Sequence, residues 1–394
     1  MSVDWELTTL AGCSENLDKL RKPITKSKRE AGSIPYYGAS GIVDHVANYI
    51  FDEDLLLVSE DGANLLARTY PIAFSISGKT WVNNHAHVLR FSDRSTQKFV
   101  EYYLNSISLE PWVSGMAQPK LNQTKLNEIP IPLPPLPEQI RIVAILDEAF
   151  ASIDQAKANT ERNLANAREL FDSYLNRVFE EKGEGWEKSA IKDVISFIDY
   201  RGRTPQKTES GMRLITAKNV KMGFLQPFPE EYVDPEIYDS WMTRGIPRKG
   251  DVLFTTEAPL GNVAQLDTSE QVVFAQRVII MQPDRNILRP KFLRFALMPS
   301  IMQSRIHENG TGATAKGIKA KVLKSIEVPY PCSLSVQEQL ENLFEKCWES
   351  KLELVDRFER KLNTLGNLKQ SILKKAFTGE LTSNPDKVLN EAGV

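Results

Sequence analysis

The chain has 394 residues, of which 41% are hydrophobic and 25% charged, and its formal net charge is −2. This length predicts two or more globular domains, and the near-neutral charge argues against a nucleic-acid binder that acts through electrostatics alone. The sequence has no apolar run near the ~20 residues that cross a bilayer, so no membrane partner is expected. Three scattered cysteines favour a reduced, cytoplasmic protein without a disulfide framework.

The sequence contains an internal repeat. Residues 54–60 (DLLLVSE) recur 197 positions later as residues 251–257 (DVLFTTE). The same offset relates Leu126, Ile129, Pro132 and Pro134 to Leu323, Ile326, Pro329 and Pro331. Trp5 matches Trp186 at an offset of 181, so the second copy carries about 16 extra residues, which we place within 221–248. Repeats of this kind indicate two similar structural units.

Each copy predicts a mostly-β module followed by a long helix. Short apolar runs bounded by turn residues predict strands at 54–59, 80–91, 251–256 and 271–281, and short helices are expected at 95–105 and 290–307. The expected domain limits are 1–135 (first module), 136–182 (central helix), 183–333 (second module), 334–381 (C-terminal helix) and 382–394 (tail). The proline-rich strip 129–137 is expected to be extended, outside any sheet, because proline lacks a backbone donor.

The two long helices carry apolar residues at helical spacing. Residues 138–179 and 336–377 each show one narrow apolar stripe, interrupted at Lys157 and Thr160 in the first, and Gly366 weakens the second. A narrow stripe needs a partner, and the economical partner is the other helix, in an antiparallel coiled coil. The predicted seam consists of Val143, Leu146, Phe150, Ile153, Leu164, Phe171, Leu340, Phe344, Leu354, Phe358, Leu365 and Ile372.

The expected fold class is therefore α+β. Two similar, mostly-β modules are each followed by a long helix, and the helices pair as a spacer with pseudo-two-fold symmetry. The modules are expected to be held apart at opposite ends of this spacer.

The motifs that usually mark catalysis or metal binding are weak. Residues 73–80 (AFSISGKT) approach a phosphate-binding loop, but the residues that follow predict strand or loop instead of the helix that would hold a phosphate. His85 and His87 are expected to share a strand face and could ligate a metal, yet no cysteine or third histidine lies nearby. Neither a nucleophile motif nor an Asn-Pro-Pro-aromatic methyltransferase motif is present. We predict no metal site and no catalytic activity.

Several segments together resemble one known family. They are residues 117–122 (AQPKLN) with the strip up to Gln139, residues 83–90 (NNHAHVLR), their weaker second copies at 274–278 and 312–339, and residues 377–381 (FTGEL). In this order and in duplicate they resemble the specificity subunit of type I restriction-modification systems. The second strip departs from the pattern at 331–335, where the proline run is lost. Residues 138–139 match 338–339 at an offset of 200, whereas the helix ends match at 198, which leaves the phase of the second helix open.

The resemblance implies a role in double-stranded DNA recognition. Each module would be a target-recognition domain for one half of a split, asymmetric site. The helices would set the spacer length and dock two methyltransferase subunits, which an endonuclease and translocase subunit would join. S-adenosylmethionine would belong to the methyltransferase, and ATP and Mg²⁺ to the endonuclease, with no cofactor on this chain. The location would be prokaryotic cytoplasm, at the nucleoid. The alternative is a coiled-coil scaffold without DNA specificity, which explains the helices but not the paired basic segments.

Candidate DNA-binding residues follow from side-chain chemistry. Arg and Lys suit phosphates and guanine, and Asn and Gln suit adenine. In the first module the candidates are Lys26, Lys28, Arg29, Tyr36, Tyr37, Ser40, Lys79, Asn83, Asn84 and His85. In the second they are Arg201, Arg203, Lys207, Lys218, Asn219, Gln276, Arg277, Lys316 and Lys319. Each could instead be structural, and a pair such as Tyr36-Tyr37 is more often half-buried core.

Overall fold

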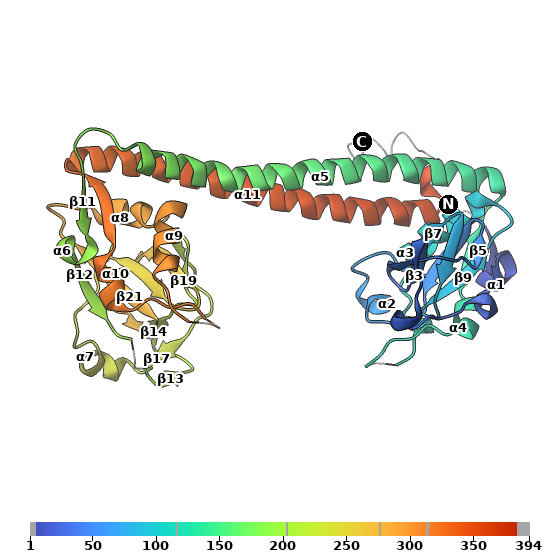
Figure 1. Cartoon of the computed structure of the whole chain (residues 1–394), viewed down its shortest axis with the longest axis horizontal. Coiled ribbons are helices and arrows are strands. Elements are labelled where there is room, and N and C mark those ends of the chain that lie inside the picture. The colour runs from blue at the N-terminus through green and yellow to red at the C-terminus, as the bar shows by residue number, and fades with distance from the viewer. Residues whose placement is uncertain (1–4, 116, 202–203, 276, 313–314, 384–394) are drawn as a thin grey trace. The chain divides into compact units, whose positions relative to one another are not determined.

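The computed structural model describes residues 5–115, 117–201, 204–275, 277–312 and 315–383. The chain divides into two compact units (Figure 1). The first unit combines residues up to Glu161 with those from Arg360 onward, and the second is the continuous stretch Arg162–Glu359. Each unit therefore contains one module and one segment of each long helix. Over the described residues, no helix is both long and apolar enough to cross a membrane.

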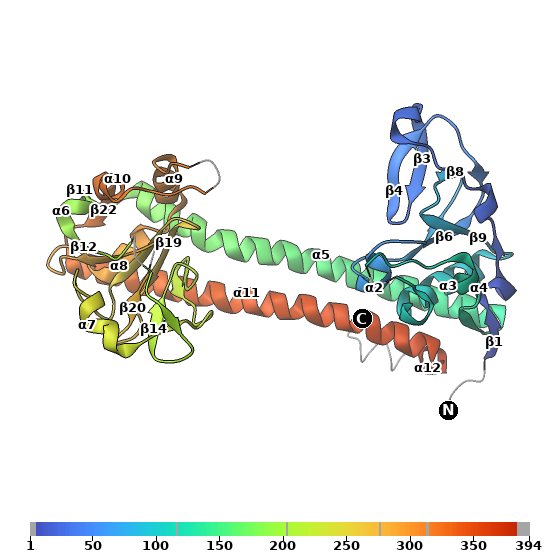
Figure 2. The ribbon, with the colours of Figure 1, turned by 90° about the horizontal axis from the view of Figure 1, so that it is seen from below.

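The first module is built on strand β6, which is buried along its whole length. It lies in a sheet of order β2-β9-β6-β7, formed by Glu15–Asn16, Ala86–Arg90, Leu55–Ser59 and Ala73–Ile76. A second sheet has the order β4-β3-β8-β5, formed by Gly41–Val46, Ala31–Gly38, Lys79–Val82 and Phe51–Asp52; Figure 2 shows its β3–β4 hairpin. Helix α3 (Arg94–Ser106), capped by Asp93, packs Phe99 into the core.

The second module repeats this plan. Its sheet of order β12-β21-β18-β19 is formed by Ile195–Asp199, Val278–Pro283, Val252–Thr256 and Leu260–Gln265. A further sheet of order β13-β17-β14-β20 is formed by Lys207–Thr208, Tyr232–Val233, Met212–Ile215 and Val273–Phe274. The registers also correspond, because Val58 faces His87 in β6–β9 and Thr255 faces Val278 in β18–β21. The repeat in the sequence is thus a repeat in the fold.

The remaining elements are short. They are α1 (Leu10–Cys13), α2 (Asn64–Ala67), α4 (Gln123–Asn127), α6 (Ile191–Val194), β15 (Val220–Lys221), β16 (Phe224–Leu225), α7 (Tyr238–Trp241), α8 (Pro290–Ala296), α9 (Ser300–Glu308), α10 (Ala320–Ser325) and α12 (Glu380–Ser383), with single 3₁₀ turns at Asp18–Leu20, Lys26–Lys28, Glu110–Trp112 and Pro235–Ile237. The helix predicted at 290–307 is divided into α8 and α9, because Pro299 cannot continue a helix from the residue before it.

The proline strips correct one expectation. Strand β10 (Pro130–Leu133) pairs antiparallel with β1 (Glu6–Thr9), and β22 (Glu327–Pro331) pairs likewise with β11 (Trp186–Ala190). These strips were expected to lie outside any sheet. They can pair because prolines occupy alternate positions, and in an antiparallel ribbon only alternate residues need to donate to the partner strand.

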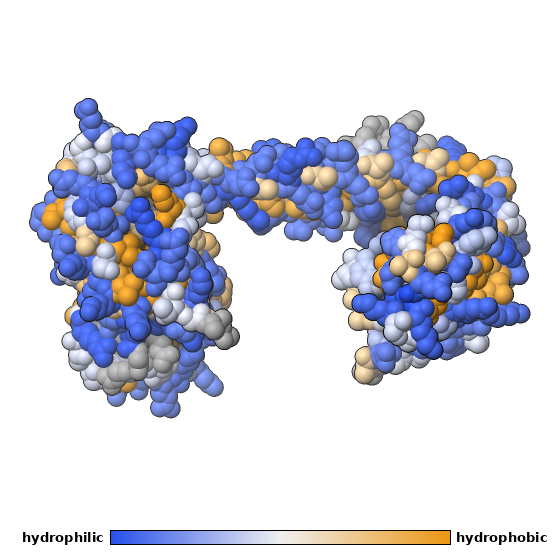
Figure 3. Space-filling model, viewed as in Figure 1, coloured by the Kyte–Doolittle hydropathy of each residue, from blue (hydrophilic) through white to orange (hydrophobic). Residues whose placement is uncertain are grey.

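Helices α5 (Leu136–Glu181) and α11 (Leu334–Phe377) run antiparallel within each unit, and the side of them seen in Figure 3 is largely hydrophilic. In the first unit Lys369 lies 3.2 Å from Asp154, and in the second Lys351 lies 3.0 Å from Asp172. Exposed pairs of this kind contribute little stability, so apolar contacts must hold the helices together.

Most of the predicted seam residues are buried or half-buried. Buried seam residues are Leu146, Phe150, Ile153, Leu164, Phe171, Phe344 and Ile372, and half-buried ones are Val143, Leu340, Phe358 and Leu365. Leu354 is an exception with 37% exposure, because it borders an open apolar pocket of about 370 Å³ beside Leu170. Thr160, predicted to interrupt the seam, is buried and donates its hydroxyl to the Ala156 carbonyl.

The helices also complete the module cores. Phe171, Phe179 and Phe344 pack with Phe292 of α8 in one cluster, and Leu146, Ile372 and Leu373 pack with Phe99 of α3 in another, alongside further apolar residues. The predicted boundaries between modules and helices lie close to the helix ends, yet each compact unit divides within the helices. Module and helix segment therefore form one packed body in each unit.

Candidate nucleic-acid interface

The second module contains an open pocket of about 550 Å³. Among its lining residues are Arg201, Arg277 and Lys319, all predicted from the sequence to bind DNA. The remaining lining residues are Thr256, Glu257, Thr311, Ala315, Gly317 and Ile318. The fold thus brings together cations from three distant segments, around the end of strand β18.

Arg201 is held in position at the end of strand β12. Its Nε and Nη2 donate to the two carboxylate oxygens of Asp199, at 2.8 and 2.7 Å. Burial raises the pKa of Asp199, but hydrogen bonds from Arg201 outweigh it, so the pKa lies below its usual value. Arg244 adds a bond from Nη1 to the Asp199 carbonyl at 2.7 Å. A bidentate pair of this kind fixes the direction of a guanidinium.

A neighbouring pocket of about 260 Å³ also includes Arg277 in its lining. Here Lys207 and Lys218 both contact the carboxylate of Glu231, at 2.8 and 3.3 Å. Burial raises the pKa of Glu231, but the two ammonium groups more than offset this effect and lower it. Two lysines on one carboxylate leave a net positive charge beside Arg277.

The other predicted DNA-binding residues of this module differ in their exposure. Asn219 is buried, and its Nδ2 donates to the carbonyls of Gln226, Pro227 and Pro229, so it supports the loop and presents no edge to DNA. Lys316 and Lys319 are exposed. Arg203 and Gln276 lie outside the described residues.

In the first module, cations gather around the repeated acid Glu60. Arg21 Nη1 lies 2.6 Å from one carboxylate oxygen of Glu60, and Lys120 Nζ lies 3.2 Å from the other. The next residue, Leu121, donates its amide to the Glu60 carbonyl at 2.8 Å. Glu60 therefore holds residues 120 and 121 beside the end of strand β6 through both its side chain and its backbone.

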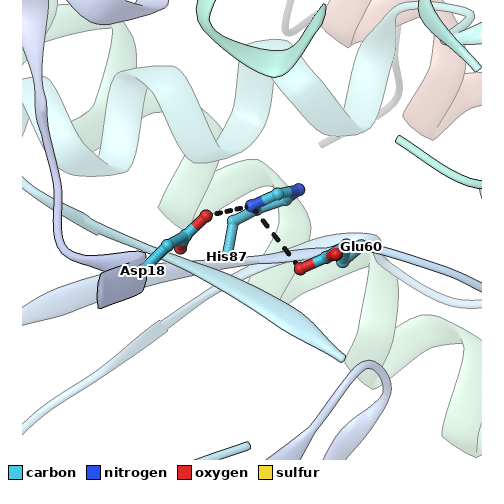
Figure 4. Close-up of side chains that lie close together, drawn as sticks. All are labelled: Asp18, Glu60 and His87. Carbon is cyan, nitrogen blue, oxygen red and sulfur yellow. Dashed lines mark hydrogen bonds and ion pairs between the residues drawn. The ribbon is translucent and has the colours of Figure 1, made fainter. Parts of the chain in front are cut away.

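His87 forms a buried link beside Glu60 (Figure 4). Its Nδ1 lies 2.6 Å from Asp18 and 3.9 Å from Glu60, and its Nε2 lies 2.8 Å from the Leu121 carbonyl. Burial raises the pKa of Asp18, but bonds from His87 and the Val88 amide outweigh it and lower the pKa. Both ring nitrogens thus lie at hydrogen-bond distance from oxygen atoms, which fixes the ring between strand β9, Asp18 and Leu121.

His85 and His87 were considered as possible metal ligands on sequence grounds, and the structure shows what surrounds each of them. Ligand atoms of Asp18, Glu60 and His87 lie within 4.8 Å of one another. Both ring nitrogens of His87 already lie at hydrogen-bond distance from oxygen atoms, those of Asp18 and of the Leu121 carbonyl. The expectation that His85 and His87 share a strand face is wrong, because His85 lies in the turn before β9 and pairs with Asp61 at 2.8 Å.

Two predicted residues of the first module are structural. Tyr36 is buried, and its hydroxyl accepts from the Ile24 amide at 3.0 Å, while the Arg29 guanidinium lies 4.4 Å from its ring centroid and pairs with Asp44. Asn83 is buried, and its Oδ1 accepts from the His85 amide at 2.7 Å. These contacts shape the β3 and β9 loops and leave neither residue exposed to a base.

Other candidates remain accessible. Lys26, Lys28, Ser40, Lys79, Asn84 and His85 are exposed. Tyr37 is half-buried against Phe74. Lys79 and the phosphate-loop-like segment lie in strands β7 and β8 and the turn between them, which contains Gly78 at φ +69°, so this segment opens no helix.

The sequence reasoning did not identify the acids or Lys120 as parts of a site, and it took Arg21 only as one member of a basic segment. Glu60, Glu257 and Glu231 organise the basic side chains, and Arg21 and Lys120 bind Glu60. The available signal was the repeat itself, because both of its copies end in glutamate. Two diverged copies of one α+β module, each with basic side chains around the same strand-end acid, define a duplicated recognition protein.

Comparison with known proteins identifies the family to which this duplicated protein belongs. Residues 2–163 and 183–347 match the family described as the type I restriction modification DNA specificity domain. A Haemophilus influenzae protein described as a putative type I restriction enzyme specificity subunit is 26% identical over 302 residues, covering 74% of this chain and 75% of that protein. The Escherichia coli EcoBI specificity subunit is 27% identical over 324 residues, covering 73% and 67% respectively.

Solved structures share the fold. A chain from a study of complex assembly and conformational transition of the type I R-M system superposes with a TM-score of 0.73 at 17% identity, covering 97% of this chain and 100% of that chain. The HsdS subunit of Thermoanaerobacter tengcongensis gives a TM-score of 0.56 at 18% identity, covering 96% and 97%. This chain belongs to the type I restriction-modification specificity family, whose members are non-catalytic subunits that give the system its DNA specificity.

Proposed function

We propose that this chain reads a split, asymmetric DNA site, with one module for each half-site. The observation that carries the proposal is that the two modules share strand pairing but surround the same acid with different residues. Glu60 contacts Arg21 and Lys120, whereas Glu257 faces Arg277. Two modules that share a fold but carry different side chains around this equivalent glutamate are suited to recognise two different DNA sequences.

Contacts of two kinds are expected in each module. Lysines that are exposed, or only partly neutralised by a carboxylate, suit phosphates, which position a protein on the duplex. These are Lys26, Lys28, Lys79, Lys207, Lys218, Lys316 and Lys319. We expect Asn84 and His85 in the first module, and Arg201 and Arg277 in the second, to reach base edges.

The helices would carry the partner subunits. Their hydrophilic outer faces and the apolar pocket beside Leu170 offer a surface for two methyltransferase subunits, which an endonuclease and translocase subunit would join. S-adenosylmethionine would then be held by the methyltransferase, and ATP and Mg²⁺ by the endonuclease. The complex would act in the prokaryotic cytoplasm, at the nucleoid.

The direct test is to co-express this chain with its methyltransferase subunit in a host free of DNA methylation and to map modified adenines across the genome. We expect one consensus of two short half-sites separated by a fixed gap. A stable complex that adds no methylation would contradict the proposal and favour a scaffold without DNA specificity.

Deleting one heptad from each helix, residues 157–163 and 360–366, is expected to shorten the preferred gap. Seven residues at about 1.5 Å each span about 10 Å, or roughly three base pairs. A whole heptad preserves the phase of the seam. The mapped consensus measures the gap, and the unchanged half-sites serve as the internal control. A gap of unaltered length would show that the helices do not set the spacing.

A further inference from the structure

The glutamate that ends both copies of the repeat is largely buried in the first module and partly exposed in the second. Glu60 has a side chain only 12% exposed and contacts both Arg21 and Lys120. Glu257, its counterpart at the repeat offset of 197, has a side chain 44% exposed. The residue at the place of Lys120 is Gly317, which brings no cation. The carboxylate of Glu257 therefore faces the pocket.

Arg277 is the cation beside this open carboxylate. Its Nη2 lies 3.8 Å from Glu257 Oε1, too far for a hydrogen bond, and its side chain is 48% exposed. Across the described ranges, no hydrogen bond engages the side chain of either residue. Arg201, Lys207 and Lys218 differ, since each is held by a carboxylate at 3.3 Å or less. The guanidinium donors and the carboxylate acceptors are available to a ligand.

The backbone at Arg277 is held in an unusual conformation. Its φ is +74°, in the left-handed region that non-glycine residues rarely adopt. The Arg277 carbonyl accepts from the Thr256 amide at 2.8 Å, which fixes the residue to strand β18. Strain of this kind persists where the surroundings impose it, and it is concentrated at functional sites.

The pair matches one base pair better than any other. In the major groove, guanine presents the acceptors O6 and N7, and its cytosine presents the N4 donor beside them. An arginine can donate to both guanine acceptors while a carboxylate accepts from cytosine N4. An A·T pair would set the adenine N6 donor against the guanidinium and the thymine O4 acceptor against the carboxylate. We propose that Arg277 and Glu257 together read one G·C base pair in the half-site of the second module, an inference that rests on the proposed function.

The acid also argues against a phosphate as the ligand. A carboxylate within 4 Å of the guanidinium repels a phosphate, but it gains a hydrogen bond from cytosine. Lys316 and Lys319 are exposed in the adjoining segment and can serve the phosphates. Base reading and backbone binding are thus divided between different side chains.

The test uses the full chain with its methyltransferase subunits, a DNA library with randomised half-sites, and sequencing of the bound fraction. In Arg277→Ala and in Glu257→Ala, we expect the same single position to lose its G·C preference while all other positions keep theirs. Affinity for the wild-type site should fall roughly 5- to 150-fold in Arg277→Ala. In the double variant Arg277→Gln/Glu257→Gln, preference at that position should move toward A·T, because glutamine suits adenine and the carboxylate that would oppose thymine O4 is gone.

Two controls separate base reading from other roles. Arg277→Lys keeps the charge but loses the planar fork of donors, so it would restore a phosphate contact in full and guanine recognition only in part. Lys316→Ala should weaken all sequences equally. The inference is overturned if the two alanine variants relax different positions, or if Arg277→Ala weakens every sequence alike. A wild-type complex that selects no split consensus contradicts the proposed function itself, whereas a split consensus that is insensitive to Arg277 contradicts only the pair.

Discussion

Replacing Phe344 with alanine is expected to lower the free energy of unfolding of the second unit by about 4 kcal/mol. Phe344 comes from α11 and is fully buried. Its ring centroid lies 5.9 Å from that of Phe179 on α5 and 5.3 Å from that of Phe295 on α8. The truncation would leave a cavity where two long helices meet the module, so all three elements lose contacts together.

Hydrogen exchange provides the measurement, because the two units need not unfold together. Amides of strand β18 should exchange faster in Phe344→Ala, while those of β6 in the first unit keep their rates. Leu354→Ala is the matched control, since Leu354 lies on the same helix at 37% exposure and should cost less than about 1 kcal/mol. Equal effects from the two variants would contradict a core role for Phe344.

Replacing Asp18 with alanine is expected to lower the stability of the first unit by about 3 kcal/mol. The substitution leaves the buried His87 ring and the Val88 amide without their carboxylate. Because the folded-state pKa of Asp18 lies below its usual value, the carboxylate stabilises the fold at pH values above about 4. That contribution is lost as the pH falls through the folded-state pKa, so wild type and variant should converge in acid.

Asp61→Ala is the matched control for this prediction. Asp61 pairs with His85 at the same kind of distance, 2.8 Å, but the His85 side chain is 52% exposed. Exposed pairs contribute at most about 1 kcal/mol, so this variant should unfold close to wild type. Thermal unfolding followed at several pH values would measure both. A pH-independent difference between Asp18→Ala and wild type would mean that the carboxylate charge is not the source.

The large features of the fold were predictable because they depend on periodic patterns. The 197-residue offset predicted two similar modules, and the apolar stripes predicted α5 and α11 closely. The proline strips were misjudged, since which residues must donate in a ribbon depends on register. Leu354 was placed in the seam by spacing alone, and spacing does not say where a neighbouring helix leaves a pocket open.

The candidate site was predictable only in part. Residue type singled out Arg201, Arg277 and Lys319 as candidates, and the fold gathers these three in one pocket. Tyr36, Asn83 and Asn219 are buried, unlike the accessible candidates. Residue type could not show this, because burial depends on tertiary packing. The acids escaped attention because a carboxylate is an unusual component of a DNA-binding surface, and its partner depends on long-range contacts such as Arg21 with Glu60.

The division of the long helices between the compact units has a consequence for synthesis on the ribosome. The second unit is continuous, whereas the first needs Ile372, Leu373 and Leu381 to cover the apolar face around Leu146. About 200 residues separate the two parts of the first unit, or roughly 10 to 40 s of translation at 5–20 residues per second. The module made first is therefore completed last, and its uncovered face is the surface that a chaperone would meet on the nascent chain.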